Sequence, residues 1–134
     1  MDITGHFLSY LRKFINLSDE EFNQYLLPVI NIRKPEKKEI LTHAGEVENN
    51  IFFIVKGLVR KYYLKHNDEI NTQLSYEGHI IHSQESFHSR TPSEYFVETI
   101  EPCVMISMTY DDLEALFAKS HRMEHMGRLI ITHT

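Results

Sequence analysis

Residues 42–64, THAGEVENNIFFIVKGLVRKYYL, contain two apolar runs separated by a short break. Branched and aromatic side chains dominate both runs, 51–55 and 58–64, and this composition is typical of β-strands. Lys56-Gly57 lies between the runs, and glycine adopts the backbone angles that tight turns require. The pattern predicts a β-hairpin that turns at Lys56-Gly57.

Further short apolar or alternating runs surround this pair. Turn-forming residues such as Pro35, Gly45, Gly78 and Pro102 separate the runs at close intervals. Parallel strands would need long crossover connections, so these short connections favour an antiparallel sandwich or barrel. The expected strands are residues 29–32, 39–43, 51–55, 58–64, 70–76, 94–100 and 104–108.

Helical periodicity flanks the strands on both sides. Apolar residues recur at three- and four-residue spacing within 6–27, where Ser18 and Glu21 have the spacing of a capping box and Pro28 is expected to end the helix. The helical period returns after Met108. We therefore expect a single domain of mainly β class, with N-terminal helices in 1–27, a β-roll in 28–109 and C-terminal helices in 110–134.

Composition excludes several classes of protein. The 134 residues carry a formal charge of −5, and no run of Lys or Arg is longer than the pair Lys37-Lys38, so we expect no nucleic-acid surface. The single cysteine, Cys103, cannot form an internal disulfide, which predicts a reducing, cytoplasmic location. No segment has the pattern of a signal peptide or the length of a membrane span, so we expect no membrane partner.

The order of these elements, together with three glycines, resembles the cyclic-nucleotide-binding domain of the Crp/Fnr transcription regulators. Gly45-Glu46 and Gly57 in the opening stretch, and Gly78 in SYEGHII, occupy the family's turn positions. The resemblance extends from about residue 18 to 134 and implies a double-stranded β-helix, or jelly roll. It also implies a ligand-sensing role, with DNA contacted only by a helix-turn-helix domain that this chain lacks.

The resemblance implies a candidate ligand pocket at Gly78, His79, Ile80, His82, Arg90 and Ser93. Family members that bind cyclic AMP use a glutamate for the ribose and an arginine for the phosphate. His79 stands where the glutamate is expected and Pro92 where the arginine is expected, although Arg90 lies nearby. We therefore expect no cyclic AMP binding in the usual mode. The effector is then an unknown small molecule, and no cofactor is expected.

The last helical segment has the spacing of a dimer seam. Met123, Met126 and Ile130 repeat at intervals of three and four residues, with Leu129 beside them. In the resembled family a long helix at this place pairs two subunits, so we expect a homodimer and a helix that continues beyond residue 134. The alternative is that this stripe packs against the chain's own sheet.

Three histidines invite a metal-site interpretation. His79, His82 and His88 lie near Glu85, and these residue types bind transition metals, so a cupin-like metal-binding protein or metalloenzyme is the alternative function. On an extended strand, however, His79 and His82 point in opposite directions, which predicts solvent-exposed histidines and no metal site. No catalytic constellation is apparent, so an enzyme is not expected. A dimerisation module without any ligand is the third possibility.

Overall fold

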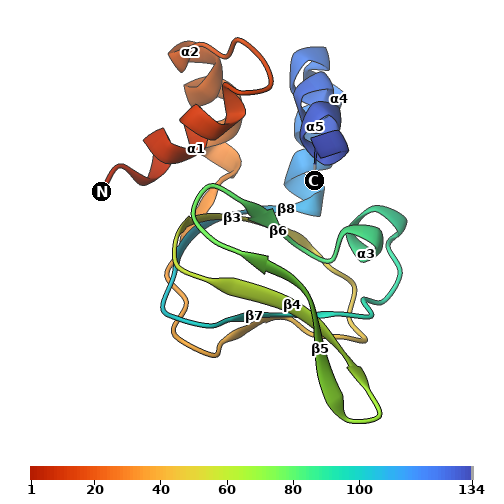
Figure 1. Ribbon diagram of the computed structural model, residues 1–134. Coiled ribbons are helices and arrows are strands. Elements are labelled where there is room, and N and C mark those ends of the chain that lie inside the picture. Colours follow the sequence, from red (N-terminus) through yellow and green to blue (C-terminus); the bar gives the residue numbers. More distant parts are fainter. Residues whose placement is uncertain (134) are drawn as a thin grey trace.

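The computed structural model describes residues 1–133 and consists of two antiparallel four-stranded sheets with helices beside them (Figure 1). Sheet A has the order β1-β8-β3-β6, and sheet B has the order β2-β7-β4-β5. This architecture confirms the predicted antiparallel β-roll with flanking helices. The strands are β1 (Asn31–Arg33), β2 (Ile40–Thr42), β3 (Asn50–Lys56), β4 (Val59–Lys65), β5 (Asp68–Ser75), β6 (Ile80–Ile81), β7 (Phe96–Thr99) and β8 (Val104–Thr109).

The helices gather on the outer side of sheet A, except for α3, which lies at one end of the roll (Figure 1). They are α1 (Ile3–Leu11), α2 (Asp19–Glu21), the π-helical turn η1 (Phe22–Leu26), the 3₁₀ turn η2 (Leu27–Val29), α3 (Gln84–Ser89), α4 (Tyr110–Lys119) and α5 (His121–His133). None of the helices within residues 1–133 is long and apolar enough to cross a membrane.

The N-terminal helical region differs in detail from the prediction. A non-helical connection separates α1 from α2, so 6–27 is not one continuous helix. The capping box is confirmed, because the Glu21 N–H donates to the Ser18 hydroxyl at 3.1 Å and the Ser18 N–H donates to the Glu21 carboxylate at 3.2 Å. Pro28 lies inside η2, where its missing N–H costs no helical hydrogen bond.

The predicted hairpin at Lys56-Gly57 is wrong. β3 pairs with β6 and β8 in sheet A, whereas β4 pairs with β5 and β7 in sheet B, so the chain crosses between sheets at this turn. Gly57 has a φ of +118°, which L side chains rarely adopt. The turn residue was therefore predicted correctly, but its role is to connect the two layers.

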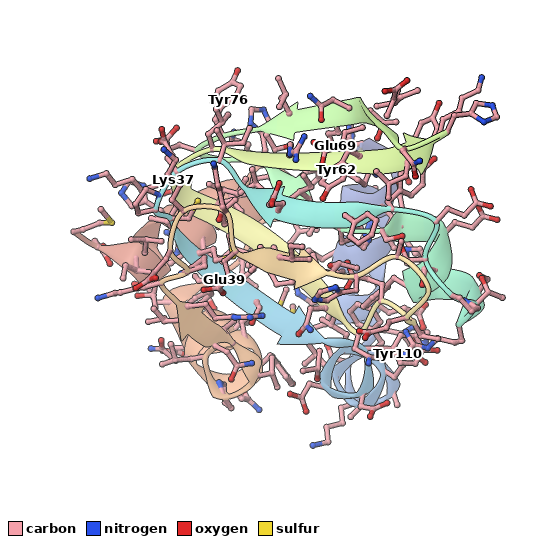
Figure 2. All side chains as sticks on the ribbon, turned by 90° about the horizontal axis from the view of Figure 1, so that it is seen from below. Lys37, Glu39, Tyr62, Glu69, Tyr76 and Tyr110 are labelled. Atoms are coloured by element: carbon pink, nitrogen blue, oxygen red, sulfur yellow. The ribbon has the colours of Figure 1, made fainter. Side chains whose placement is uncertain are left out.

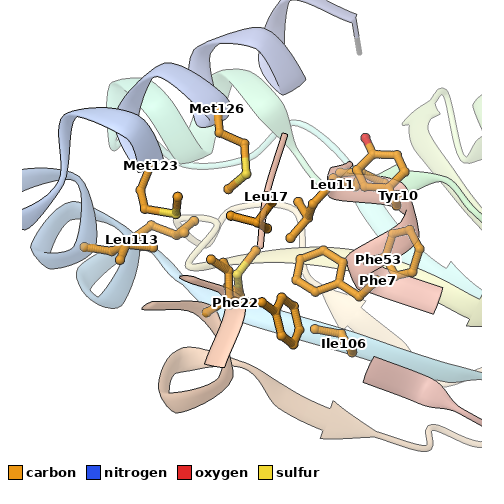
Figure 3. Packing of buried hydrophobic residues seen from close by; sticks show 14 of the residues in the cluster. Phe7, Tyr10, Leu11, Leu17, Phe22, Phe53, Ile106, Leu113, Met123 and Met126 are labelled. Carbon is orange, nitrogen blue, oxygen red and sulfur yellow. The ribbon is translucent and has the colours of Figure 1, made fainter. Parts of the chain in front are cut away.

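Strand β3 explains why the opening stretch is apolar without alternation. Phe52 and Ile54 lie in the cluster between the sheets, and Phe53 and Val55 lie in the cluster between sheet A and the helices. Successive side chains of a strand point to opposite faces, so a strand covered on both faces is apolar at every position. Figure 3 shows the helix-side cluster, in which Phe53 packs beside Phe7 and Tyr10.

Helix α5 covers part of the same cluster. Met123 and Met126, at 0% and 3% exposure, point into the chain's own core (Figure 3). These two residues therefore follow the alternative prediction, in which the apolar stripe packs within one chain. Ile130 packs partly against this core, whereas Leu129 is half-buried and belongs to neither cluster. Two of the four predicted seam residues are therefore covered within one chain. The homodimer stays a prediction.

Candidate ligand-binding site

A network of buried polar side chains lies at the end of the roll where α3 meets the loop between β2 and β3. Such a cluster stands out, because buried polar groups require hydrogen-bond partners. The network joins three segments that are far apart in the sequence. Its buried members are Thr42, Glu48, Ser83, Ser86 and Ser93.

Glu48 is the central residue of this network, with only 2% of its surface exposed. One carboxylate oxygen accepts hydrogen bonds from the Ser83 N–H at 3.0 Å and from the Thr42 hydroxyl at 2.9 Å. The N–H groups of Asn49 and Asn50 also favour the charged form of this carboxylate. Burial raises the pKa of the Glu48 carboxyl, and the donated hydrogen bonds offset part of that rise.

Three serines complete the network. The Glu48 N–H donates to the Ser86 hydroxyl at 2.8 Å, and the Ser86 hydroxyl in turn donates to the Thr91 carbonyl at 2.5 Å. The hydroxyl groups of Ser93 and Ser83 lie 2.6 Å apart. Ser93, which was a predicted pocket residue, therefore lies in the site with its hydroxyl already paired.

Lys61 and Arg90 lie around the site, and Arg60 lies next to Lys61 on β4; the protein engages all three cations. Lys61 on β4 donates to the His82 carbonyl at 3.3 Å, and burial lowers the pKa of its ammonium group, although the Glu48 charge opposes this. Tyr62 and Glu69 lie on strands β4 and β5 of sheet B (Figure 2), and the Arg60 guanidinium lies 3.9 Å from the centre of the Tyr62 ring. It pairs there with Glu98 at 2.6 Å and Glu69 at 3.0 Å.

Arg90, the third cation, ends α3 in a left-handed conformation with a φ of +59°. Its guanidinium donates to the Glu48 carbonyl at 2.9 Å and the Phe87 carbonyl at 3.0 Å, and also to the Asn49 side chain. The group lies 3.9 Å from the centre of the Tyr110 ring. In this position Arg90 braces the end of α3.

The histidines of this region lie in different environments. His79 is exposed and packs against the Tyr76 ring at 4.4 Å, whereas His82 is only 5% exposed and packs against Phe87 and His88. The two side chains diverge as predicted, but the prediction that His82 lies in solvent is wrong. Within residues 1–133, no three His, Cys, Asp or Glu side chains come together to hold a metal ion.

His82 carries the largest electrostatic perturbation around the site. Burial, with smaller contributions from the charges of His88 and Lys61, lowers the pKa of the His82 imidazole to about 3. Its Nε2 atom is buried and has no hydrogen-bond partner among the residues that the structure describes. The ring is therefore neutral over the physiological pH range.

One known protein family matches most of this chain. The family model described as the cyclic nucleotide-binding domain matches residues 32–120. The chain belongs to this family. A comparison with curated protein sequences gave no match.

Solved structures share the fold of this cyclic nucleotide-binding domain. A cyclic nucleotide-binding domain from Methylobacillus flagellatus has a TM-score of 0.81 at 16% identity, with 96% of this chain and 74% of that chain covered. The sensor domain of the transcriptional regulator DNR from Pseudomonas aeruginosa has a TM-score of 0.73 at 15% identity, with 90% and 80% covered.

The catabolite activator protein of Thermus thermophilus has a TM-score of 0.75 at 16% identity, with 92% of this chain covered. This cyclic nucleotide-binding domain spans 57% of the length of that protein.

The six predicted pocket residues of the cyclic nucleotide-binding domain separate in space. Ser93 lies in the Glu48 network and His82 borders it through its carbonyl, whereas Ile80 faces the helix-side core and His79 faces solvent. Gly78 lies in a turn with a φ of +86°. The site also contains residues that were absent from the prediction: Thr42, Glu48, Lys61, Ser83 and Ser86.

A cyclic phosphate requires unpaired N–H groups or cations to bind its oxygens. In this domain the Ser83 N–H and the Thr42 hydroxyl already donate to Glu48, and Arg90 donates to carbonyls. The Glu48 carboxylate would also lie close to any anion bound by these donors. In this arrangement the donors around Glu48 are therefore already paired within the chain.

Proposed function

We propose that this cyclic nucleotide-binding domain is the sensor domain of a Crp/Fnr-like transcription regulator that does not bind cyclic AMP in the usual mode. The family match and the likeness to regulator sensor domains support the regulatory role. The observation that carries the proposal on the pocket is the buried Glu48 carboxylate, which accepts the hydrogen bonds that a phosphate would need.

The proposed mechanism is a shift between two arrangements of the helices beside the roll. An effector that binds near α3 would favour one placement of α4 and α5, and thereby of a DNA-binding domain outside this chain. We propose that the effector is a small molecule other than cyclic AMP. The cupin-like metalloenzyme alternative is not favoured, because the family match and the divergence of His79 from His82 both oppose it.

Calorimetry tests the proposal on the pocket. Each charge-assisted hydrogen bond contributes about 1.5–3 kcal/mol. This site has no free phosphate-binding cation and no free supporting donors. We therefore expect it to bind cyclic AMP at least about a hundredfold more weakly than a site that has them. We expect no saturable heat at micromolar cyclic AMP. A micromolar or tighter dissociation constant would contradict the proposal, and its loss in Arg90→Ala would show that Arg90 moves into the site.

We further propose that the domain forms a homodimer through α5, with Leu129 in the contact. Replacing Leu129 with glutamate is expected to weaken dimerisation by at least about tenfold, because it removes an apolar contact and places a charge in the interface. Sedimentation velocity across a range of concentrations measures this. His125→Glu, at an exposed position of the same helix, is the matched control.

Met126→Glu is unsuitable for this purpose, since Met126 lies in the core of a single chain and its replacement would unfold the domain. Two results would contradict an α5 interface. One is a parent that stays monomeric at all concentrations, and the other is a Leu129→Glu variant that dimerises as strongly as the parent.

A further inference from the structure

Hydrogen-bond donors from three segments converge on the Glu48 carboxylate. The Thr42 hydroxyl comes from the end of β2, and the Ser83 N–H comes from the residue before α3. The N–H groups of Asn49, just before β3, and Asn50, its first residue, also favour the charged carboxylate. Convergent main-chain N–H groups with a hydroxyl form the kind of cradle that binds anions. Here the anion belongs to the chain itself.

The rest of Glu48 is also attached to α3. Its N–H donates to the Ser86 hydroxyl at 2.8 Å, and its carbonyl accepts from the Arg90 guanidinium at 2.9 Å. Together with the Ser83 contact to the carboxylate, this single residue makes three contacts with α3 and the residues that flank it. A bound ligand could hold the β2–β3 loop and α3 together in the same way, but Glu48 does so without one.

We propose that Glu48 is a built-in ligand, whose carboxylate fills an anion site in its own chain and excludes effectors that bind there through a phosphate or carboxylate group. This inference rests on the proposed function, in which the region around α3 is the sensor site. A tethered carboxylate has a high effective concentration and loses little translational freedom when it binds, so a free anion competes with it poorly.

The test removes the built-in anion and supplies a free one. Glu48→Ala is expected to melt about 10 °C below the wild-type domain, because several buried donors lose their acceptor. Acetate, which restores the missing carboxylate, is expected to raise the melting temperature of Glu48→Ala by about 3 °C relative to chloride at equal ionic strength. Inorganic phosphate is the second probe. Wild type and Glu46→Ala, an exposed position in the same loop, are expected to respond to neither anion.

Equal responses of Glu48→Ala and Glu46→Ala to acetate and phosphate would overturn the inference. If Glu48→Ala does not fold, Glu48→Gln decides instead. The inference then requires the Ser83 amide proton to move upfield in NMR spectra, because a neutral amide accepts more weakly than a carboxylate. An unmoved Ser83 proton would overturn it. Tight binding of cyclic AMP by the wild type would refute the proposed function, whereas a missing acetate rescue would refute only the role of Glu48.

Discussion

Replacing Gly57 with alanine is expected to lower the free energy of unfolding by about 3 kcal/mol. Gly57 has a φ of +118°, so any L side chain there is strained. A Cβ atom would also overlap the Cys103 sulfur and lie 3.0 Å from the Cys103 Cα. The main chain must shift to relieve this overlap, and the shift would disturb the passage between the two sheets.

Urea denaturation of Gly57→Ala and Gly45→Ala separates overlap from backbone strain. Gly45 has a φ of +93°, but an added Cβ would meet nothing within 4 Å. We expect Gly45→Ala to lose only about 1 kcal/mol, from the backbone conformation alone. Equal losses in the two variants would show that the contact with Cys103 does not constrain the turn.

Acid is expected to destabilise the domain through His82. Burial lowers the pKa of this histidine from 6.5 to about 3, so the folded state keeps it neutral while the unfolded state takes up a proton. The stabilisation is therefore fully present above pH 6.5 and is lost progressively as the pH falls toward about 3. The loss approaches about 1.4 kcal/mol per pH unit within this window.

His82→Leu is expected to remove this dependence. Urea denaturation at a series of pH values from neutral to about 5 measures it as the difference in slope between wild type and variant. His88, whose pKa is also lowered by burial, remains in the variant, so the difference reports on His82. His125→Leu, the same exchange at an exposed position, is the matched control. A His82→Leu variant with an unchanged slope would contradict the buried, neutral histidine.

The sequence predicted the strands and the Ser18 capping box because these depend on local composition. The wrong hairpin at Lys56-Gly57 shows the limit of that approach. A turn between two strands looks the same whether the strands pair with each other or belong to different sheets. Phe53 pairs with Ile106 across fifty-three residues of sequence, and no local pattern encodes that choice. The short strand β6 and helix α3 were missed because neither is long enough to show a period.

The candidate site was predicted less well than the fold. Glu48 lies in a polar stretch, AGEVENN, where a glutamate is expected to be exposed. Its burial depends on Ser83 and Ser86, which are brought to it by the folding of α3 against the β2–β3 loop. Ser93 was predicted because the family resemblance marks that position. Met123 and Met126 had the correct spacing for burial, but spacing alone does not say whether the cover is the same chain or a second one.

The most direct measurement follows the side-chain carboxyl carbon of Glu48 by NMR in the wild-type domain while cyclic AMP is added. If Glu48 fills the anion site, its carboxyl resonance should stay unchanged up to about 1 mM cyclic AMP. A saturable movement of that resonance with a micromolar midpoint would show that the nucleotide displaces the carboxylate. That result would contradict both the exclusion of anionic effectors by Glu48 and the proposal that this domain does not bind cyclic AMP in the usual mode.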